Sequence, residues 1–168
     1  PAPGAPEIRF DAVTFSYGDQ PILRGLSFTA PPGATTAIVG ASGAGKSTVF
    51  QLLTGLVDPS GGKILIGGVE ASTLALHDQR SLFASVTQDA ALFDETLREN
   101  IALGQTLSDE ALNAACRDAH VADFLPQLSQ GIDTPVGPRG SALSGGQRQR
   151  VAIARALAQD RPVLLLDE

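Results

Sequence analysis

The stretch GASGAGKST, residues 40–48, constrains this chain more than any other feature of its sequence. It fits the pattern G-x-x-x-x-G-K-[ST], with Gly40, Gly45, Lys46 and Ser47 at the defined positions. The apolar run ATTAIVG before it is expected to form a short buried strand, and GKSTVFQLLTG after it has apolar residues at helical spacing. A strand, a glycine-rich turn and a helix in this order predict a phosphate-binding loop.

Each part of this loop has a physical task. Glycines let the backbone approach a phosphate closely and turn its N–H groups inward, and the helix N-terminus adds partial positive charge. Lys46 is expected to reach the β- and γ-phosphates, and the Ser47 hydroxyl to ligate Mg²⁺. The expected phosphate contacts are the consecutive residues Gly43, Ala44, Gly45, Lys46, Ser47 and Thr48. The alternative is a glycine-rich turn that binds nothing, which requires a chance match to a rare pattern.

The sequence PVLLLDE at the other end of the chain supplies a matching acid. Val163 to Leu166 are predicted to form a strand buried on both faces, with Asp167 at its carboxyl tip. Phosphate loops also emerge at carboxyl ends of strands, so Asp167 is expected to complete the magnesium site. Glu168 is expected to polarise the attacking water as a general base. The alternative for Glu168 is a solvated terminal carboxylate.

The remaining pattern predicts an α/β fold. Residues 1–6 are rich in proline, glycine and alanine and indicate a linker, and residues 7–168 are predicted to form one domain. Its first part should be antiparallel, with a turn or bulge near Asp11 and a second strand broken by Gly25. Residues from about 74 to 150 are expected to form an inserted helical subdomain, in which a serine caps the segment SDEALNAACRDAHVADFLPQL.

Composition excludes several classes of protein. A net charge of −6 and an isoelectric point near 4.8 argue against nucleic acid as a partner, because phosphate backbones need clustered lysine and arginine. No run approaches the roughly 20 apolar residues of a transmembrane helix. Cys116 is the only cysteine, so no internal disulfide is possible, and we interpret it as a small buried hydrophobe in preference to a reactive thiol.

The segment SALSGGQRQRVAIARAL, residues 141–157, indicates which kind of phosphate-loop protein this is. Ser144 and the glycines after it present a hydroxyl and backbone N–H groups at a predicted helix N-terminus, which is a second anion site. A serine-capped helix alone would explain Ser144 but not the pentapeptide LSGGQ. Together with the phosphate loop and LLLDE, this pentapeptide resembles the signature of the ATP-binding cassette (ABC) family.

The resemblance covers nearly all of the chain after the linker and implies further roles. Tyr17 matches the aromatic residue that stacks on adenine, with a core aromatic at a strand end as the alternative. Gln88 matches the glutamine that contacts the metal and the attacking water. Ser144, Gly146 and Gln147 would reach the γ-phosphate bound by a second subunit, so that two ATP molecules lie between two head-to-tail nucleotide-binding domains.

Two segments resemble exporter-type members of the family. LFDETLRENIALG follows the glutamine, and TPVGPRGSALSGGQ resembles the loop that contacts transmembrane coupling helices. That loop has Pro138 where the family has an acidic residue, which puts the charge-mediated part of coupling in question. The segment before Gln88 also departs from a Leu-Arg pattern, with His77 and Asp78 at about those positions. His77 is interpreted as a surface residue, since no second metal ligand is nearby.

The resemblance implies an ATPase that drives a transmembrane partner at the cytoplasmic face of a membrane, with the transported substrate unreadable from this chain. Two alternatives remain: a soluble cassette ATPase of the repair or translation type, and a module that binds ATP only to dimerise. The family continues past Glu168 with a switch histidine and further strands, and His77 and His120 both precede the signature. We therefore expect these 168 residues alone to bind ATP but to hydrolyse it very little, with missing C-terminal strands leaving an exposed sheet edge.

Overall fold

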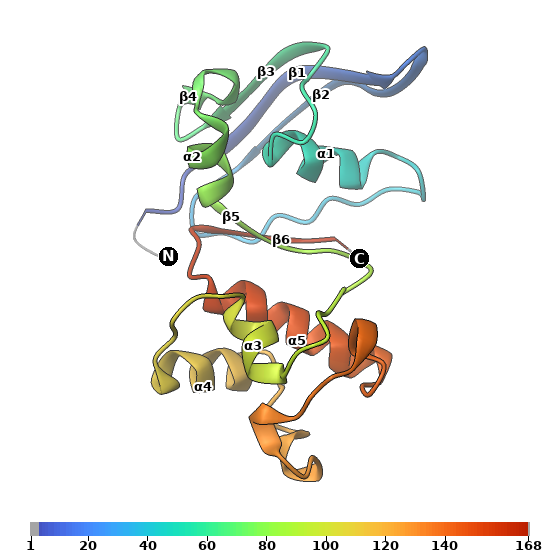
Figure 1. Ribbon diagram of the computed structural model, residues 1–168. Coiled ribbons are helices and arrows are strands. Elements are labelled where there is room, and N and C mark those ends of the chain that lie inside the picture. The colour runs from blue at the N-terminus through green and yellow to red at the C-terminus, as the bar shows by residue number, and fades with distance from the viewer. Residues whose placement is uncertain (1–3, 168) are drawn as a thin grey trace. The chain divides into compact units, whose positions relative to one another are not determined.

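A computed structural model describes residues 4–167 of the chain (Figure 1). They form two compact units: the sheet unit, which runs to Phe83 and includes Asp167, and the helical unit, Ala84–Leu166. No helix in the described part of the chain is long and apolar enough to cross a membrane. Each unit has its own core and carries its own part of the predicted site.

The sheet unit is built on four antiparallel strands in the order β2-β1-β3-β4. They are β1 (Ile8–Tyr17), β2 (Gln20–Ala30), β3 (Gly61–Ile66) and β4 (Val69–Glu70). In β1 every second residue is buried, first Ile8 and Phe10 and then, after a shift of one position in this alternation, Val13 and Phe15. The phase changes at Ala12, which has a φ of 48°, and the register with both neighbouring strands shifts there. This confirms the bulge predicted near Asp11.

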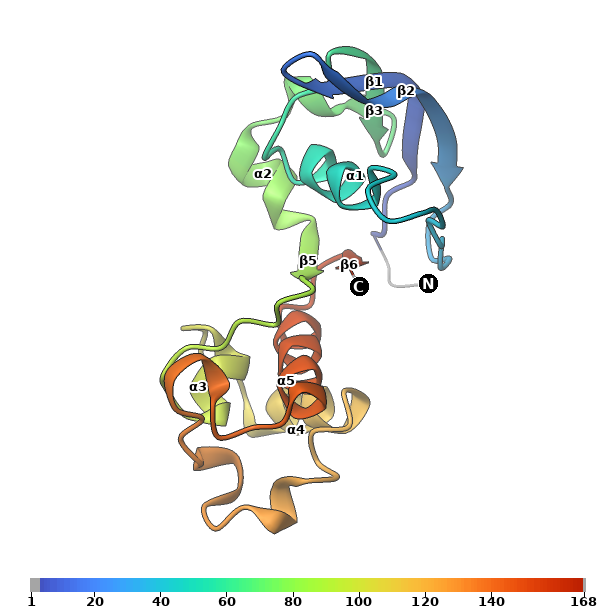
Figure 2. The ribbon, with the colours of Figure 1, turned by 90° about the vertical axis from the view of Figure 1, so that its right-hand side faces the viewer.

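One helix of the sheet unit follows the phosphate loop. Helix α1 (Lys46–Leu53) lies against one face of the sheet (Figure 2) and buries Val49, Leu52 and Leu53, because these residues recur at helical spacing. A short helical turn, η1 (Ala71–Thr73), and helix α2 (Leu76–Ser81) complete the unit. The helix predicted from GKSTVFQLLTG is therefore confirmed, although Leu56 lies beyond its end and is exposed.

Two predictions about strands in the sheet unit were wrong. Residues 34–40 do not form a buried strand; they have no regular secondary structure and no strand partner in the described part of the chain, and Val39 is 89% exposed. A strand needs a neighbour to satisfy its N–H and C=O groups, and an apolar sequence alone does not supply one. Gly25 does not break the second strand, because β2 continues through it with a φ of 83° at an irregularity in the register.

The helical unit packs its helices around α5 (Gly145–Ala158). Its other elements are β5 (Phe83–Val86, beginning at the unit boundary), α3 (Leu97–Ala102), α4 (Asp109–Asp118), the short turns η2 (Leu125–Gln127), η3 (Gly131–Asp133) and η4 (Pro138–Gly140), and β6 (Val163–Leu166). Helices α3 and α4 both contact α5 (Figure 1). Ser108 caps α4 by accepting from the N–H of Ala111, as predicted, and Cys116 is buried in the resulting core.

Strand β6 differs from its prediction. Leu165 is buried, but Leu164 and Leu166 are 40% and 51% exposed, so the strand is not buried on both faces. It belongs to a sheet of two strands with β5, whose buried Ala84 and Val86 pack against Ala152 and Ala156 of α5. An apolar run predicts a doubly buried strand only when layers cover both faces.

Candidate functional site

The phosphate loop ends at Gly45, the residue directly before α1. Gly45 is the N-cap residue of α1 with a φ of 90°, and no side chain within residues 4–167 caps this end of the helix. A Cβ atom at Gly45 would lie 2.8 Å from Ile22 Cγ2 and 2.9 Å from Leu23 Cδ2. Only glycine therefore lets the loop adopt this left-handed turn while it packs against β2.

The side chains at the end of the phosphate loop lie where a bound phosphate could contact them. The Lys46 ammonium group donates to the carbonyl oxygens of Gly40 at 2.9 Å and Ala41 at 2.8 Å, so it lies over the loop. Ser47 is exposed in the first turn of α1, and Thr48 is buried beneath it. The N-terminus of α1, a cation and an exposed hydroxyl are thus adjacent, which is a suitable arrangement for a polyphosphate.

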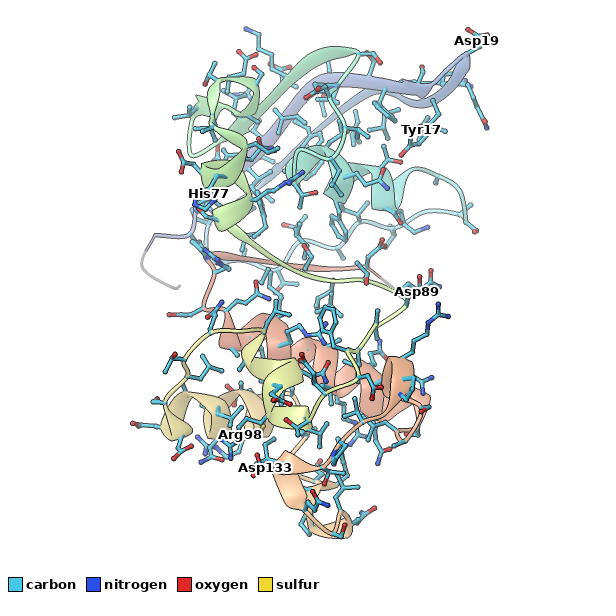
Figure 3. All side chains as sticks on the ribbon, viewed as in Figure 1. Tyr17, Asp19, His77, Asp89, Arg98 and Asp133 are labelled. Atoms are coloured by element: carbon cyan, nitrogen blue, oxygen red, sulfur yellow. The ribbon has the colours of Figure 1, made fainter. Side chains whose placement is uncertain are left out.

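Tyr17 ends β1 beside α1 (Figure 3). Its hydroxyl donates to the side-chain oxygen of Gln51 on α1, and its ring meets Phe15 edge to face at a centroid distance of 4.8 Å. The residue is 48% exposed, so it is not the buried core aromatic that was its alternative interpretation. The same helix therefore connects the tyrosine to the phosphate loop.

Helix α2 fixes the other end of α1, which sequence reasoning missed. The buried Gln79 donates to the carbonyl oxygen of Leu53 at 2.8 Å, and Arg80 donates to those of Thr54 at 3.0 Å and Gly55 at 3.3 Å. These contacts satisfy carbonyl groups that a helix C-terminus leaves without partners and place a cation at the negative end of its dipole. His77, on the same short helix, is exposed.

In the helical unit, the signature segment begins α5 with a capping box. Ser144 Oγ accepts from the N–H of Gln147 at 3.2 Å, and Gln147 Oε1 accepts from the N–H of Ser144 at 2.8 Å. Ser144 and Gly146 are exposed. Arg148 donates to the carbonyl oxygen of Leu143 at 2.7 Å and so supports the turn before the signature. The sequence predicted the serine cap but not its reciprocal partner.

Gln88 lies in an exposed turn directly after β5, next to the labelled Asp89 in Figure 3. The chain after this turn is tied to α5 through Asn100 of α3, which is fully buried. Asn100 accepts from the N–H of Phe93 at 2.8 Å and donates to the carbonyl oxygens of Phe93 and Thr96, each at 3.0 Å. Arg155 of α5 donates to the Asn100 side chain at 2.8 Å.

Arg155 makes further contacts in the same place. It donates to the backbone carbonyl oxygens of Asn100 at 2.7 Å and Ala91 at 2.9 Å, and it lies 5.5 Å from the centre of the Phe93 ring. Burial lowers the pKa of its guanidinium, and the nearby Glu95 opposes this. Sequence reasoning missed both residues. The signal available for Asn100 was a polar residue three positions after the apolar Leu97, which places both on the same face of an amphipathic helix.

The loop before the signature is tied to α3. The N–H of Leu97 donates to the carbonyl oxygen of Thr134, and that of Val136 donates to the carbonyl oxygen of Glu95. Val136 is fully buried, whereas Pro138 and Arg139 are exposed. An exposed tip on a buried stem leaves the side chains of this loop open to a partner.

The candidate magnesium ligands are oxygen donors of the kind that Mg²⁺ prefers: the Ser47 hydroxyl, the Gln88 amide oxygen and the Asp167 carboxylate. Asp167 follows β6 and is partly exposed, and Glu168 lies outside the described residues. Within residues 4–167, no group of three histidine, cysteine or acidic side chains could hold a metal by itself. By its chemistry each of these oxygen donors fits Mg²⁺; Ser47 and Asp167 belong to the sheet unit and Gln88 to the helical unit.

The sheet unit thus brings together Tyr17 and the phosphate loop on α1, and the helical unit brings together the chain after Gln88 and the signature helix. Comparisons with known proteins identify the family to which this sequence is similar. Residues 23–168 match the family described as ABC transporter. The mycobactin import ATP-binding/permease protein IrtB of Mycolicibacterium thermoresistibile is 50% identical over 165 residues, which cover 98% of this chain and 28% of that protein.

Two further relatives agree with this match. The ATP-dependent lipid A-core flippase of Burkholderia orbicola is 47% identical over 96% of this chain and 28% of the flippase. The solved structure of a bacterial Atm1-family ABC exporter with ATP bound matches with a TM-score of 0.93 and 47% identity, covering 98% of this chain and 29% of that one. The chain spans less than a third of the length of these three relatives. The predicted α/β cassette fold is confirmed, and the chain belongs to the ABC transporter family.

Proposed function

We propose that this chain binds Mg-ATP and contributes to its hydrolysis within an exporter-type ABC transporter. The observation that carries the proposal is the start of α1, where a glycine-capped helix, the Lys46 ammonium group and the Ser47 hydroxyl are adjacent. A polyphosphate would take the place of the two loop carbonyl groups that Lys46 now contacts. The charge-assisted bonds it would form are stronger than those to neutral carbonyl oxygens.

The residues then have distinct tasks. Tyr17, held by Phe15 and Gln51, would stack on the base, and residues 43–48 would hold the phosphates through backbone N–H groups. Ser47, Gln88 and Asp167 would hold Mg²⁺, which neutralises charge on the β- and γ-phosphates when bound. By the family resemblance, Glu168 would accept a proton from the attacking water. Catalysis of this kind depends mainly on positioning and charge stabilisation.

We further propose that a second nucleotide-binding domain completes the site. At the start of α5, Ser144 and Gly146 are exposed and Gln147 is partly exposed. The family resemblance would have these residues contact the γ-phosphate held by the opposing domain. The exposed tip of the loop with Pro138 and Arg139 would face the transmembrane partner, at the cytoplasmic side of the membrane. The relatives' names include an import protein, a flippase and an exporter, which supports coupling to a membrane step in general.

The decisive experiment compares the only two lysines of the chain in the full-length protein. Lys46→Ala should abolish magnesium-dependent ATP hydrolysis, because the cation over the phosphate loop is lost. Lys63→Ala, on an exposed position of β3, is the matched control and should keep wild-type turnover. Hydrolysis that survives Lys46→Ala would refute the proposal.

A module that binds ATP only to dimerise is the second candidate, and the signature helix start supports it as well. The variant Glu168→Gln distinguishes the two: in an ATPase it should trap an ATP-bound dimer and stop turnover, whereas in a binding module it should change nothing. For the 168 residues as a separate polypeptide we propose ATP binding with very little hydrolysis. Lys46-dependent turnover well above background by that polypeptide would contradict this.

A further inference from the structure

The contacts between Asn100 and Arg155 join two segments that the proposed function uses separately. On one side is the backbone of Ala91 and Phe93, which continues the turn carrying Gln88. On the other side is α5, whose first residues form the signature. Both segments lie in the helical unit. Within residues 4–167 no buried side-chain nitrogen or oxygen lacks a hydrogen-bond partner, so each buried polar atom of this group has at least one partner.

Apolar packing between the two segments does not explain these contacts. Leu92 already shares a hydrophobic core with Val151 and Ala154 of α5. Hydrophobic contact is non-directional, so it holds surfaces together without fixing their register. Hydrogen bonds depend steeply on distance and angle, so a group of them fixes one relative position. Burying the Asn100 amide and partly burying the Arg155 guanidinium is costly, and a position that needed only adhesion would be served by a leucine.

Arginine is also the side chain that this geometry requires. Its planar fork contacts two acceptors on Asn100 and one on Ala91 at the same time, with distances of 2.7–2.9 Å. A lysine ammonium group is a compact point charge on a flexible stem and cannot reproduce that fork.

We propose that Asn100 and Arg155 are positioning residues that make the chain after Gln88 and the signature helix move as one body. A displacement of Gln88, such as ATP binding would cause, is then transmitted through Ala91 and Phe93 to α5 and to Ser144. This inference rests on the function proposed above for its role in catalysis, but the mechanical link between the two segments stands on the contacts alone.

The link is tested first by a distance measurement in the full-length protein. Asp89 and Gln149 are both exposed, so each can be changed to cysteine and spin-labelled on a background without other reactive thiols. The wild type should give one narrow distance distribution. Arg155→Lys should broaden it by several ångströms, and Arg150→Lys, an exposed position on the same helix, should leave it unchanged. Phe93→Leu removes only the ring near the guanidinium and should broaden the distribution less, which provides a second variant that does not disturb the core.

The second readout is ATP turnover by the same variants. Arg155→Lys should lower kcat roughly tenfold or more, as small displacements of catalytic groups do. KM for ATP should stay within about twofold, because Tyr17 and the phosphate loop lie in the other unit. A purely structural role predicts the opposite pattern, in which the correctly folded fraction keeps wild-type kcat and an unchanged distance distribution. That result with both Arg155→Lys and Phe93→Leu would overturn the inference. Lack of Lys46-dependent turnover in the wild type would instead count against the proposed function, and the distance measurement would still decide the link.

Discussion

Gly45→Ala is the substitution whose cost the structure defines most sharply. The residue has a φ of 90°, a conformation that side chains with a Cβ rarely adopt. The new methyl group would lie 2.8 Å from Ile22 Cγ2 and 2.9 Å from Leu23 Cδ2 of β2. Either the loop moves away from β2 or the partly buried Ile22 and the buried Leu23 side chains leave their positions. Both responses lower the stability of the sheet unit before any nucleotide is bound.

The magnitude follows from two separate contributions. A left-handed conformation costs a residue with a Cβ about 1–2 kcal/mol, and overpacking of a core costs about 1–3 kcal/mol more. Gly43→Ala is the matched control, because Gly43 has a φ of 79° but a Cβ there would meet nothing within 4 Å. Gly43→Ala should therefore cost about 1–2 kcal/mol and Gly45→Ala about 2–5 kcal/mol.

The chain provides its own probe for this measurement. Tyr17 is the only tyrosine and there is no tryptophan, so intrinsic fluorescence reports the sheet unit alone. Urea unfolding followed by this signal, without nucleotide, gives the free energy of unfolding for each variant. If Gly43→Ala and Gly45→Ala lower it equally, the close approach of Gly45 to β2 does not matter and the reasoning is refuted.

Two further predictions concern single contacts. Gln79→Met should lower the free energy of unfolding of the sheet unit by about 1–3 kcal/mol, because it leaves the Leu53 carbonyl without its donor. The same change at the exposed His77 should have little effect in the same urea titration. In the helical unit, hydrogen bonds from Thr96 lower the pKa of Glu99 below its ordinary value of 4.5. A carboxylate whose pKa is lowered in the folded state stabilises the fold at pH values above its unfolded pKa. This contribution is lost as the pH falls through the folded pKa. Glu99→Gln should therefore make acid unfolding of the helical unit less steep below pH 4.5, as monitored by circular dichroism.

Local patterns predicted the elements that depend on local chemistry. The phase change in the apolar alternation of β1 indicated the bulge at Ala12, and Ser108 indicated the start of α4. Both features follow from neighbouring residues, through backbone sterics in one case and an N-cap hydrogen bond in the other.

Features that depend on distant partners could not be predicted in this way. Residues 34–40 have the composition of a strand, but a strand exists only where another strand pairs with it. The exposure of Leu164 depends on which layers cover β6, and composition carries no information on that. The contacts of Arg155 with Asn100 join residues that are far apart in the sequence, and each alone resembles an ordinary surface residue of a polar helix.

The two helix N-termini of the proposed site differ in a way that ranks their contributions to ATP binding. Helix α1 begins at Gly45 with no side-chain cap in the described residues, and Lys46 lies beside it. Helix α5 begins at Ser144, whose hydroxyl already accepts from the N–H of Gln147, so a phosphate must compete with an internal bond there.

A phosphate at α1 therefore gains a cation and free N–H groups, whereas one at α5 gains less and loses a cap worth about 1 kcal/mol. For a single chain at concentrations too low for dimerisation, Lys46→Ala should weaken ATP binding far more than Ser144→Ala. Titration of a fluorescent ATP analogue measures both affinities. Equal losses would mean that the signature binds nucleotide without a second domain, contrary to the role proposed for it.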